Sequence, residues 1–374
     1  MTTPSPLRLG IIGTGLAVEQ LHWPALRRMT DRYRITAFAD IDRDHAHHFA
    51  EYSGASMDDF TPDYHDLLLR DDIDAVLISL PIANVAQVLR DTIEMGKHTI
   101  CEKPPGATDE QARALLDVER AHPDQKVLIS ENYFYRDDVR LAKSLVEHGI
   151  LGRIHLMTCM QAATMQPEEG QFSGTPWRME GNYTGGVHLD GGVHQMAQIR
   201  MLMGDARHLS AEIQDANDLY GGPSDLILTL RFVNGAIGSY VDTEPANHVP
   251  FLPSEMRIYG TEGTMVIGGK TVAIHREHQV ETWSLDDMDG GYFGEFLNFH
   301  EAVTGNADIV GTLAQSIRTM ELVTQGIRSA ETGQVITLRD DDRLGPLSEH
   351  PLPLWLPQGQ SSLEVNARRH VTSR

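Results

Sequence analysis

Short apolar runs alternate with amphipathic stretches over residues 7–130. A short unbroken apolar run is typical of a strand buried on both faces, whereas apolar residues spaced three and four apart indicate a helix. The expected strands cover residues 7–12, 34–39, 75–80, 98–101 and 127–130. The expected helices cover residues 16–29, 41–52, 85–95 and 109–121. This alternation predicts βαβ units, and therefore a parallel sheet with right-handed crossovers.

The pattern changes after residue 133, where longer strands replace the short apolar runs. We expect a helix at 137–148 and strands at 154–163, 226–233, 236–241, 256–259, 264–267 and 270–276. Asn234–Gly235 separates two of these strands, and an Asn-Gly step is a strong hairpin signal. Helices at about 294–303 and 312–332 follow. The second half therefore predicts an α/β domain with a large, open, mostly antiparallel sheet.

A glycine loop follows the first strand and reads Gly13-Thr14-Gly15-Leu16-Ala17-Val18. The first glycine allows a tight turn, and the second lets a pyrophosphate approach the backbone. The start of the next helix offers unpaired N–H groups and a positive dipole end to the phosphates. A plain tight turn is the simpler alternative. Because the loop lies between a strand and a helix in a βαβ pattern, it predicts dinucleotide binding by residues 13–17.

Asp40 ends the second expected strand, at the distance expected for the acid that binds the adenosine ribose. A carboxylate there accepts a hydrogen bond from the 2′-hydroxyl and repels a 2′-phosphate, which favours NAD over NADP. The alternative is a solvated loop acid, since Asp42 and Asp44 are close by. Arg43 leaves NADP as the less favoured cofactor, because an arginine could pair with the phosphate.

These patterns predict two domains and an irregular tail in a chain of 374 residues, a length that suits two domains. Residues 1–132 form a Rossmann dinucleotide-binding domain with a parallel sheet. Residues 133–340 form the α/β domain with the open sheet. Residues 341–374 are rich in proline and read as an irregular C-terminal tail.

Charge and cysteine content narrow the class of protein. The formal net charge of −22 argues against nucleic acid or an anionic membrane as a partner. No apolar run approaches the roughly 18–20 residues that span a bilayer, and the N-terminus lacks the features of a signal peptide. The two cysteines, Cys101 and Cys159, cannot form a disulfide framework, so we expect a cytoplasmic protein.

Lys103 follows the strand at 98–101 in the sequence Cys101-Glu102-Lys103-Pro104. Ligands of such sheets bind at the carboxyl ends of the strands, so a lysine there can face the nicotinamide side of the site. An exposed loop lysine is the alternative.

Residues 185–194 read Gly-Gly-Val-His-Leu-Asp-Gly-Gly-Val-His, and apolar spacing predicts a helix from Asp190 to Gly204. Asp190 and His194 are then one turn apart on one face, about 6 Å along the axis. Three readings stay open: half of a metal site, a binding and acid–base pair for an alcohol, or a capping aspartate beside a structural histidine.

Six motifs together resemble the glucose–fructose oxidoreductase, inositol 2-dehydrogenase and rhizopine-catabolism family of NAD(P)-dependent oxidoreductases. They are GTGLAV at 13–18, HWPAL at 22–26, GKHTICEKP at 96–104, ENYFYR at 131–136, TPWR at 175–178 and GGVHLDGGVH at 185–194. The resemblance runs from about residue 7 to 338. It implies a Rossmann domain, an open-sheet α/β domain and oligomerisation through that sheet, as a homodimer or homotetramer.

The resemblance also implies roles for matching residues. Lys103 binds the substrate hydroxyl, His194 is the general base that takes its proton, and Asp190 orients the substrate. Beside these, Tyr133 and Arg178 are candidates for lining the substrate site, with simple packing or ion pairing as the alternative. The expected cofactor-binding residues beyond the glycine loop are Ser79, Leu80, Pro81, Glu102 and Lys103. For Glu102, orienting Lys103 is the alternative. The chain departs from the family in the loop at 80–85, which is aliphatic where Asn and His are common, and at Ala197, where Asp is common.

The predicted function is NAD-dependent transfer of a hydride between a secondary hydroxyl of a sugar, inositol or related polyol and nicotinamide, with no metal site. A glycosidase that uses NAD transiently is one alternative. A dinucleotide-sensing regulator without catalytic activity is another.

Overall fold

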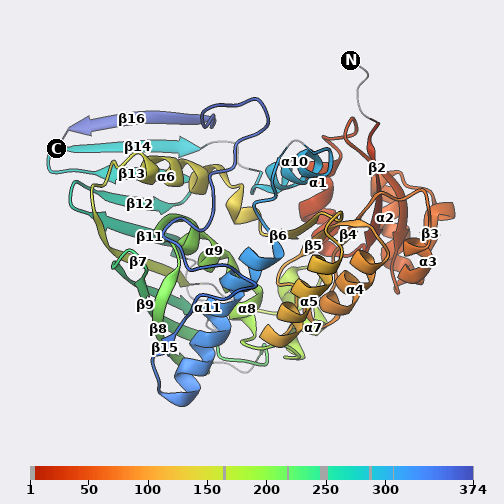
Figure 1. Ribbon diagram of the computed structural model, residues 1–374, viewed down its shortest axis with the longest axis horizontal. Coiled ribbons are helices and arrows are strands. Elements are labelled where there is room, and N and C mark those ends of the chain that lie inside the picture. Colours follow the sequence, from red (N-terminus) through yellow and green to blue (C-terminus); the bar gives the residue numbers. More distant parts are fainter. Residues whose placement is uncertain are drawn as a thin grey trace. The chain divides into compact units, whose positions relative to one another are not determined.

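A computed structural model describes residues 5–162, 166–216, 219–244, 252–285, 289–305 and 307–373. The chain divides into two units, which the ribbon in Figure 1 shows. The N-terminal unit comprises Met1–Glu131 and Tyr292–Ile317, and the C-terminal unit comprises Asn132–Gly291 and Arg318–Arg374. Residues 292–317 lie within the predicted domain 133–340, yet they pack with the N-terminal unit. One reason is that the Tyr33 hydroxyl donates a hydrogen bond to the Phe296 carbonyl.

The N-terminal unit contains a parallel sheet of six strands in the order β3-β2-β1-β4-β5-β6. The strands are β1 Leu7–Ile12, β2 Tyr33–Ala39, β3 Phe60–Thr61, β4 Ala75–Ile78, β5 His98–Glu102 and β6 Val127–Ser130. The main helices are α2 Arg43–Ser53, α3 Tyr64–Leu68, α4 Ile82–Glu94, α5 Asp109–Ala121 and α10 Tyr292–Val303. The strand order reverses between β1 and β4, which is where ligands of such sheets bind.

The predicted parallel strands are confirmed, and every residue of β4 and β6 is buried. The amphipathic stretch at 16–29, which Pro24 interrupts, forms two short helical segments. Val18–His22 forms a π-helical turn, followed by the short helix α1, Trp23–Leu26. Pro24 has no amide hydrogen to donate, and the Trp23 N–H bonds to the Val18 carbonyl five residues earlier. Such turns are rare and often lie at functional sites.

The C-terminal unit contains a sheet of ten strands in the order β15-β8-β9-β10-β7-β11-β12-β13-β14-β16. The strands are β7 Ile154–Ala162, β8 Ala206–Gln214, β9 Asp225–Phe232, β10 Ile237–Thr243, β11 Leu252–Gly260, β12 Thr264–Gly268, β13 Thr271–His275, β14 Gln279–Leu285, β15 Ile336–Thr337 and β16 Ala367–Ser373. Neighbouring strands are antiparallel except for β10 and β7, which are parallel. This confirms the predicted open, mostly antiparallel sheet.

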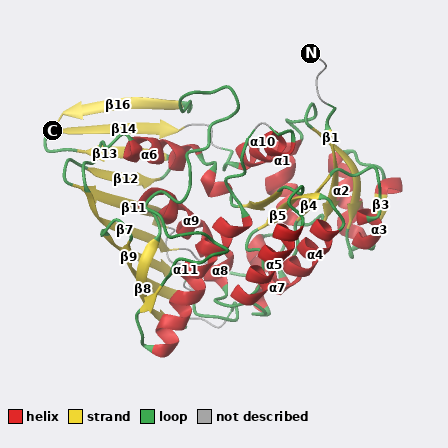
Figure 2. Ribbon diagram, viewed as in Figure 1, coloured by secondary structure: helices red, strands yellow, loops and turns green. Residues whose placement is uncertain are grey.

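Helices cover one face of this sheet (Figure 2). They include α6 Asp137–Glu147, α9 Gly192–Met203 and α11 Leu313–Thr332. Leu228 on β9 is buried against Gly326 of α11, where an added Cβ would press on the Leu228 side chain. Alternate residues of β9, such as Ile227, are exposed on the opposite face. The alternation along the strand thus separates a covered face from an open one.

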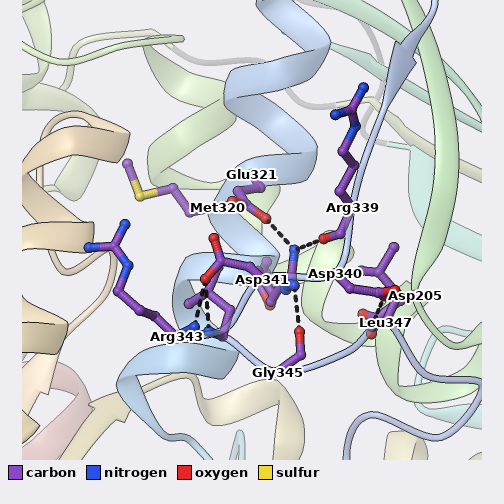
Figure 3. A network of polar contacts seen from close by, with 12 residues as sticks. Asp205, Met320, Glu321, Arg339, Asp340, Asp341, Arg343, Gly345 and Leu347 are labelled. Carbon is purple, nitrogen blue, oxygen red and sulfur yellow. Dashed lines mark hydrogen bonds and ion pairs between the residues drawn. The ribbon is translucent and has the colours of Figure 1, made fainter.

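The C-terminal tail is more ordered than the irregular segment expected at 341–374. Arg318 of α11 donates hydrogen bonds to the carbonyls of Arg339 and Gly345, and these contacts are visible in Figure 3. Within the tail, β16 pairs with β14 and places Nη2 of Arg369 2.6 Å from Oε2 of Glu281. The expectation of a wholly irregular tail was wrong, since the tail contains strand β16. The sequence did not reveal this strand, because arginine-rich β16 shows no hydrophobic alternation. Among the helices that the structure describes, none is long and apolar enough to cross a membrane.

Candidate active site

The glycine loop lies at the carboxyl end of β1, beside the end of β4. Gly13 has a positive φ of 85°, and an added Cβ would collide with the Ser79 carbonyl oxygen. A Cβ added to Gly15 would meet nothing within 4 Å, so the space above this backbone is open. Leu80 also borders Gly13, and Pro81 immediately precedes α4. One glycine therefore serves the turn, and the other leaves room for a pyrophosphate, as dinucleotide binding requires.

Asp40 fixes the end of β2 to the glycine loop. Its Oδ2 atom accepts hydrogen bonds from the Thr14 amide at 2.7 Å and the Thr14 hydroxyl at 2.9 Å. Its Oδ1 atom accepts from the Asp42 amide at 2.8 Å. Asp42 itself caps α2 by accepting from the amides of Asp44 and His45. The two acids therefore have different roles. Asp40 contacts the glycine loop, which fits a dinucleotide, whereas Asp42 caps α2.

Lys103 follows the last residue of β5, Glu102, as the sequence predicts. Oε2 of Glu102 accepts the Lys103 backbone N–H at 3.1 Å, and Oε1 lies 2.8 Å from Nε2 of His22. His22 is fully buried, with its ring edge-on to those of Tyr292 and Phe296. HWPAL was only a family landmark in the sequence, and nothing in its spacing indicates the contact of His22 with Glu102, 80 positions away.

Asp190 and His194 lie on two consecutive helices of the C-terminal unit. Asp190 ends α8, Val187–Asp190, and His194 lies in the first turn of α9. The prediction of one helix from Asp190 onward was wrong at Gly191, since the His194 amide donates to the Gly191 carbonyl at 3.2 Å. Residues 185 and 186, both glycine with positive φ, set the start of α8.

Asp190 and Arg178 form an ion pair. Nε of Arg178 lies 2.5 Å from Oδ2 of Asp190, and Nη2 lies 3.4 Å from Oδ1. The α9 helix has Gly191 at its N-cap and no capping side chain, so Asp190 is not the capping aspartate considered above. No group of three potential metal ligands occurs among the described residues. The hypothesis that Asp190 and His194 form half of a metal site therefore has no third ligand among them.

His194 stacks on Tyr133, with ring centroids 4.9 Å apart and 15° between the planes. The Arg136 guanidinium lies over the same Tyr133 ring, 4.1 Å from its centroid. The structure thus brings together two of the predicted substrate-site residues, Tyr133 and His194. Stacking restricts the orientation of the imidazole ring.

A buried polar network that the sequence patterns did not predict lies next to Asp190. Asp242 of β10 lies 2.8 Å from Nδ1 of His188 and accepts a hydrogen bond from the Tyr240 hydroxyl at 2.9 Å. The side chains of His188 and Asp242 are fully buried. The only sequence signal was the polar Asp242 at a position where the strand alternation calls for an apolar side chain.

Glu244 and Tyr183 lie close enough to this network to interact with its charges. Burial, and then the charges of Asp242 and Asp190, raise the pKa of Glu244 to about 8. Burial, followed by Asp190, also raises the pKa of the Tyr183 hydroxyl. Glu244 therefore keeps its proton at neutral pH and can donate a hydrogen bond.

Two family models match the chain. One describes the NAD-binding Rossmann fold of an oxidoreductase family and matches residues 7–130. The other describes the C-terminal alpha/beta domain of that family and matches residues 143–338. They cover most of both predicted domains.

Three individual relatives each share less than 30% sequence identity with this chain. An uncharacterized protein of Saccharomyces cerevisiae, YMR315W, is 24% identical over 80% of this chain and 88% of its own. Levoglucosan dehydrogenase of Pseudarthrobacter phenanthrenivorans is 27% identical over 70% of this chain and 73% of its own. The crystal structure of an oxidoreductase from Thermotoga maritima has a TM-score of 0.81 and 28% identity, covering 89% of this chain and 98% of that one.

The glycine loop, the two sheets and the matches across both domains agree with the resemblance read from the sequence motifs. The chain belongs to the GFO_IDH_MocA family of oxidoreductases, with an NAD-binding Rossmann fold followed by the family's C-terminal α/β domain.

Proposed function

We propose that this protein is an NAD-dependent dehydrogenase that oxidises a secondary hydroxyl of a sugar, inositol or related polyol. The observation that carries the proposal is the Asp190–Arg178 ion pair beside His194 and the buried polar network of the same unit. Such a set of donors and acceptors suits a polyhydroxylated substrate. The name of the levoglucosan dehydrogenase relative supports a sugar substrate.

The residues at the carboxyl edge of the parallel sheet fit the cofactor. Gly13, Thr14, Gly15, Leu16 and Ala17 would hold the pyrophosphate, and Asp40 the adenosine ribose. The nicotinamide half would lie near Ser79, Leu80, Pro81, Glu102 and Lys103. The Asp40 carboxylate favours NAD, because a 2′-phosphate would be repelled there. When bound, the cofactor accepts a hydride from the alcohol carbon.

Each catalytic role belongs to one side chain. His194 takes the hydroxyl proton as general base, since imidazole accepts a proton readily near neutral pH. The Lys103 ammonium binds the same oxygen and stabilises the negative charge that develops on it. Asp190, fixed by Arg178, accepts hydrogen bonds from substrate hydroxyls, and Tyr133 keeps the imidazole in orientation.

We further propose a cytoplasmic homodimer or homotetramer built on the open face of the ten-stranded sheet. Val241 pairs with Met160 on one side and Ile227 on the other, so the three side chains form a row. Met160 and Ile227 are among the exposed large hydrophobic residues, as is the nearby Ile237. An exposed apolar row is typical of a surface that another subunit covers. Light scattering of wild type and Ile227→Arg tests this, and an unchanged mass would contradict it.

A panel of sugars and polyols with NAD and NADP, followed at the NADH absorbance, tests the proposed reaction. We expect NADH to accumulate in step with the oxidised product, more rapidly with NAD than with NADP. Cleavage of a glycoside without net NADH would instead support the glycosidase. Failure to oxidise any member of the panel, with NAD bound, would contradict the proposal.

A further inference from the structure

Glu244 occupies a buried position directly after β10. Its residue surface is only 4% exposed, and its backbone amide donates to the Ser224 carbonyl at 3.0 Å. Burial of a carboxyl group is unfavourable unless other groups compensate it. Its surroundings should therefore explain why a glutamate occupies this site.

The groups around Glu244 carry more negative than positive charge. Five residues interact with Glu244 electrostatically: Asp242 and Tyr240 of β10, Asp190 of α8, and the loop residues Tyr183 and Tyr220. His188 of α8 in turn pairs with Asp242. Arg178 of α7, Pro176–Met179, is the nearby arginine, and it is already paired with Asp190. Neutral hydroxyl groups fit such surroundings better than a carboxylate or phosphate does.

Tyr183 supplies an independent sign of a ligand. The residue is 7% exposed, and its hydroxyl has no hydrogen-bond partner among the residues that the structure describes. Asp190 and Glu244 are close enough to affect the pKa of this hydroxyl. Because buried polar groups are nearly always hydrogen-bonded, a partner beyond the described residues is expected here, and a bound ligand can supply it.

We propose that the Glu244 carboxyl group and the Tyr183 hydroxyl form a second substrate subsite, which binds an uncharged, hydroxyl-bearing part of the substrate away from the oxidised carbon. The inference rests on the proposed dehydrogenase function and adds the substrate class. Protonated Glu244 donates a hydrogen bond to a substrate oxygen, and Asp190 accepts one. Ionised Glu244 cannot donate this hydrogen bond, and it adds a third negative charge to those of Asp190 and Asp242. The affinity of the subsite for the substrate therefore falls as pH rises.

The experiment compares wild type, Glu244→Gln, Glu244→Ala and the control Glu119→Gln. Glu119 is another carboxyl group whose pKa burial raises, to about 6, but it lies on α5 of the N-terminal unit. The probes are D-glucose, D-galactose, D-xylose and myo-inositol, with D-glucuronate and D-galacturonate as anionic counterparts. KM is measured from NADH formation at saturating NAD between pH 6 and pH 10. The substrate-induced shift in unfolding temperature with NAD present gives a second readout.

For the best neutral substrate, we expect the wild-type KM to rise about tenfold per pH unit above the Glu244 pKa. Glu244→Gln should show no such rise, because an amide keeps the donor and never ionises. Glu244→Ala should raise KM about tenfold at every pH. Glu119→Gln should follow wild type, and the uronates should be oxidised at least about tenfold less efficiently than their neutral counterparts.

Two results overturn the subsite. One is a Glu244→Gln profile that parallels wild type, and the other is oxidation of a uronate as efficient as that of its neutral counterpart. In both cases NADH formation by wild type leaves the proposed function standing. If NAD stabilises the wild type but no sugar or polyol binds or is oxidised, the proposed function fails and the subsite with it.

Discussion

Nε2 of His22 lies 2.8 Å from Oε1 of Glu102, and this contact joins the π-helical turn after the glycine loop to the end of β5. The other Glu102 oxygen accepts the Lys103 backbone N–H. Nδ1 of His22 has no hydrogen-bond partner within the described part of the chain, and Nε2 faces a carboxylate oxygen, which can only accept. The Nε2–H group therefore donates a hydrogen bond to Glu102. His22 is thus a positioning residue for Glu102, and through it for Lys103.

Replacing His22 with Asn should therefore lower kcat more than it raises KM for NAD. We expect kcat to fall about tenfold and the free energy of unfolding to fall by about 1–3 kcal/mol, because the partly buried Glu102 carboxylate loses its donor. Steady-state kinetics and chemical denaturation measure the two effects. His48→Asn is the matched control, since His48 pairs with Glu19 on the surface. Equal effects of the two substitutions would refute the positioning role.

Asp40 and Asp42 should differ in their effect on cofactor choice. Asp40→Asn removes the charge that repels a 2′-phosphate, so the ratio of kcat/KM with NADP to that with NAD should rise at least about tenfold. Asp42→Asn should leave this ratio unchanged, because Asp42 caps α2 and does not touch the glycine loop. A ratio that responds equally to both changes would contradict the assignment of Asp40.

Alanine substitution of the two loop glycines should have different effects, one on folding and the other on NAD binding. Gly13→Ala places a Cβ against the Ser79 carbonyl at a positive φ, so the protein should be destabilised by several kcal/mol or fail to fold. Gly15→Ala meets open space and should fold normally but bind NAD at least about tenfold more weakly. Circular dichroism and NAD titration distinguish these outcomes. Normal NAD affinity in folded Gly15→Ala would remove Gly15 from the cofactor site.

Glu244 should make stability fall as pH rises. Its pKa is raised from 4.5 to about 8 in the folded protein, so between these values the folded state binds more protons than the unfolded state. Stability from this group is fully present below the unfolded pKa and is lost as pH rises through the folded pKa. The Tm of Glu244→Gln relative to wild type should therefore increase between pH 5 and pH 9. A constant difference would mean that Glu244 has an ordinary pKa.

Local patterns accounted for the parallel sheet, because strands such as β4 are continuous apolar runs bounded by turn residues. They also placed Gly13, Asp40 and Lys103 at the carboxyl ends of strands. They could not reveal β16, where Arg369 contacts Trp283 and Glu281 of β14 and no hydrophobic alternation marks a strand. Nor could they reveal the contact between His188 and Asp242, which are 54 positions apart and meet only through the fold.

His194 and Lys103 are proposed to act on the substrate hydroxyl, and turnover by their alanine variants is the decisive measurement. NADH formation with the best sugar or polyol is measured for wild type, His194→Ala and Lys103→Ala, with NAD binding titrated separately. We expect each substitution to lower kcat at least about 10²-fold while NAD still binds. Near-normal turnover in both variants would contradict the proposed roles.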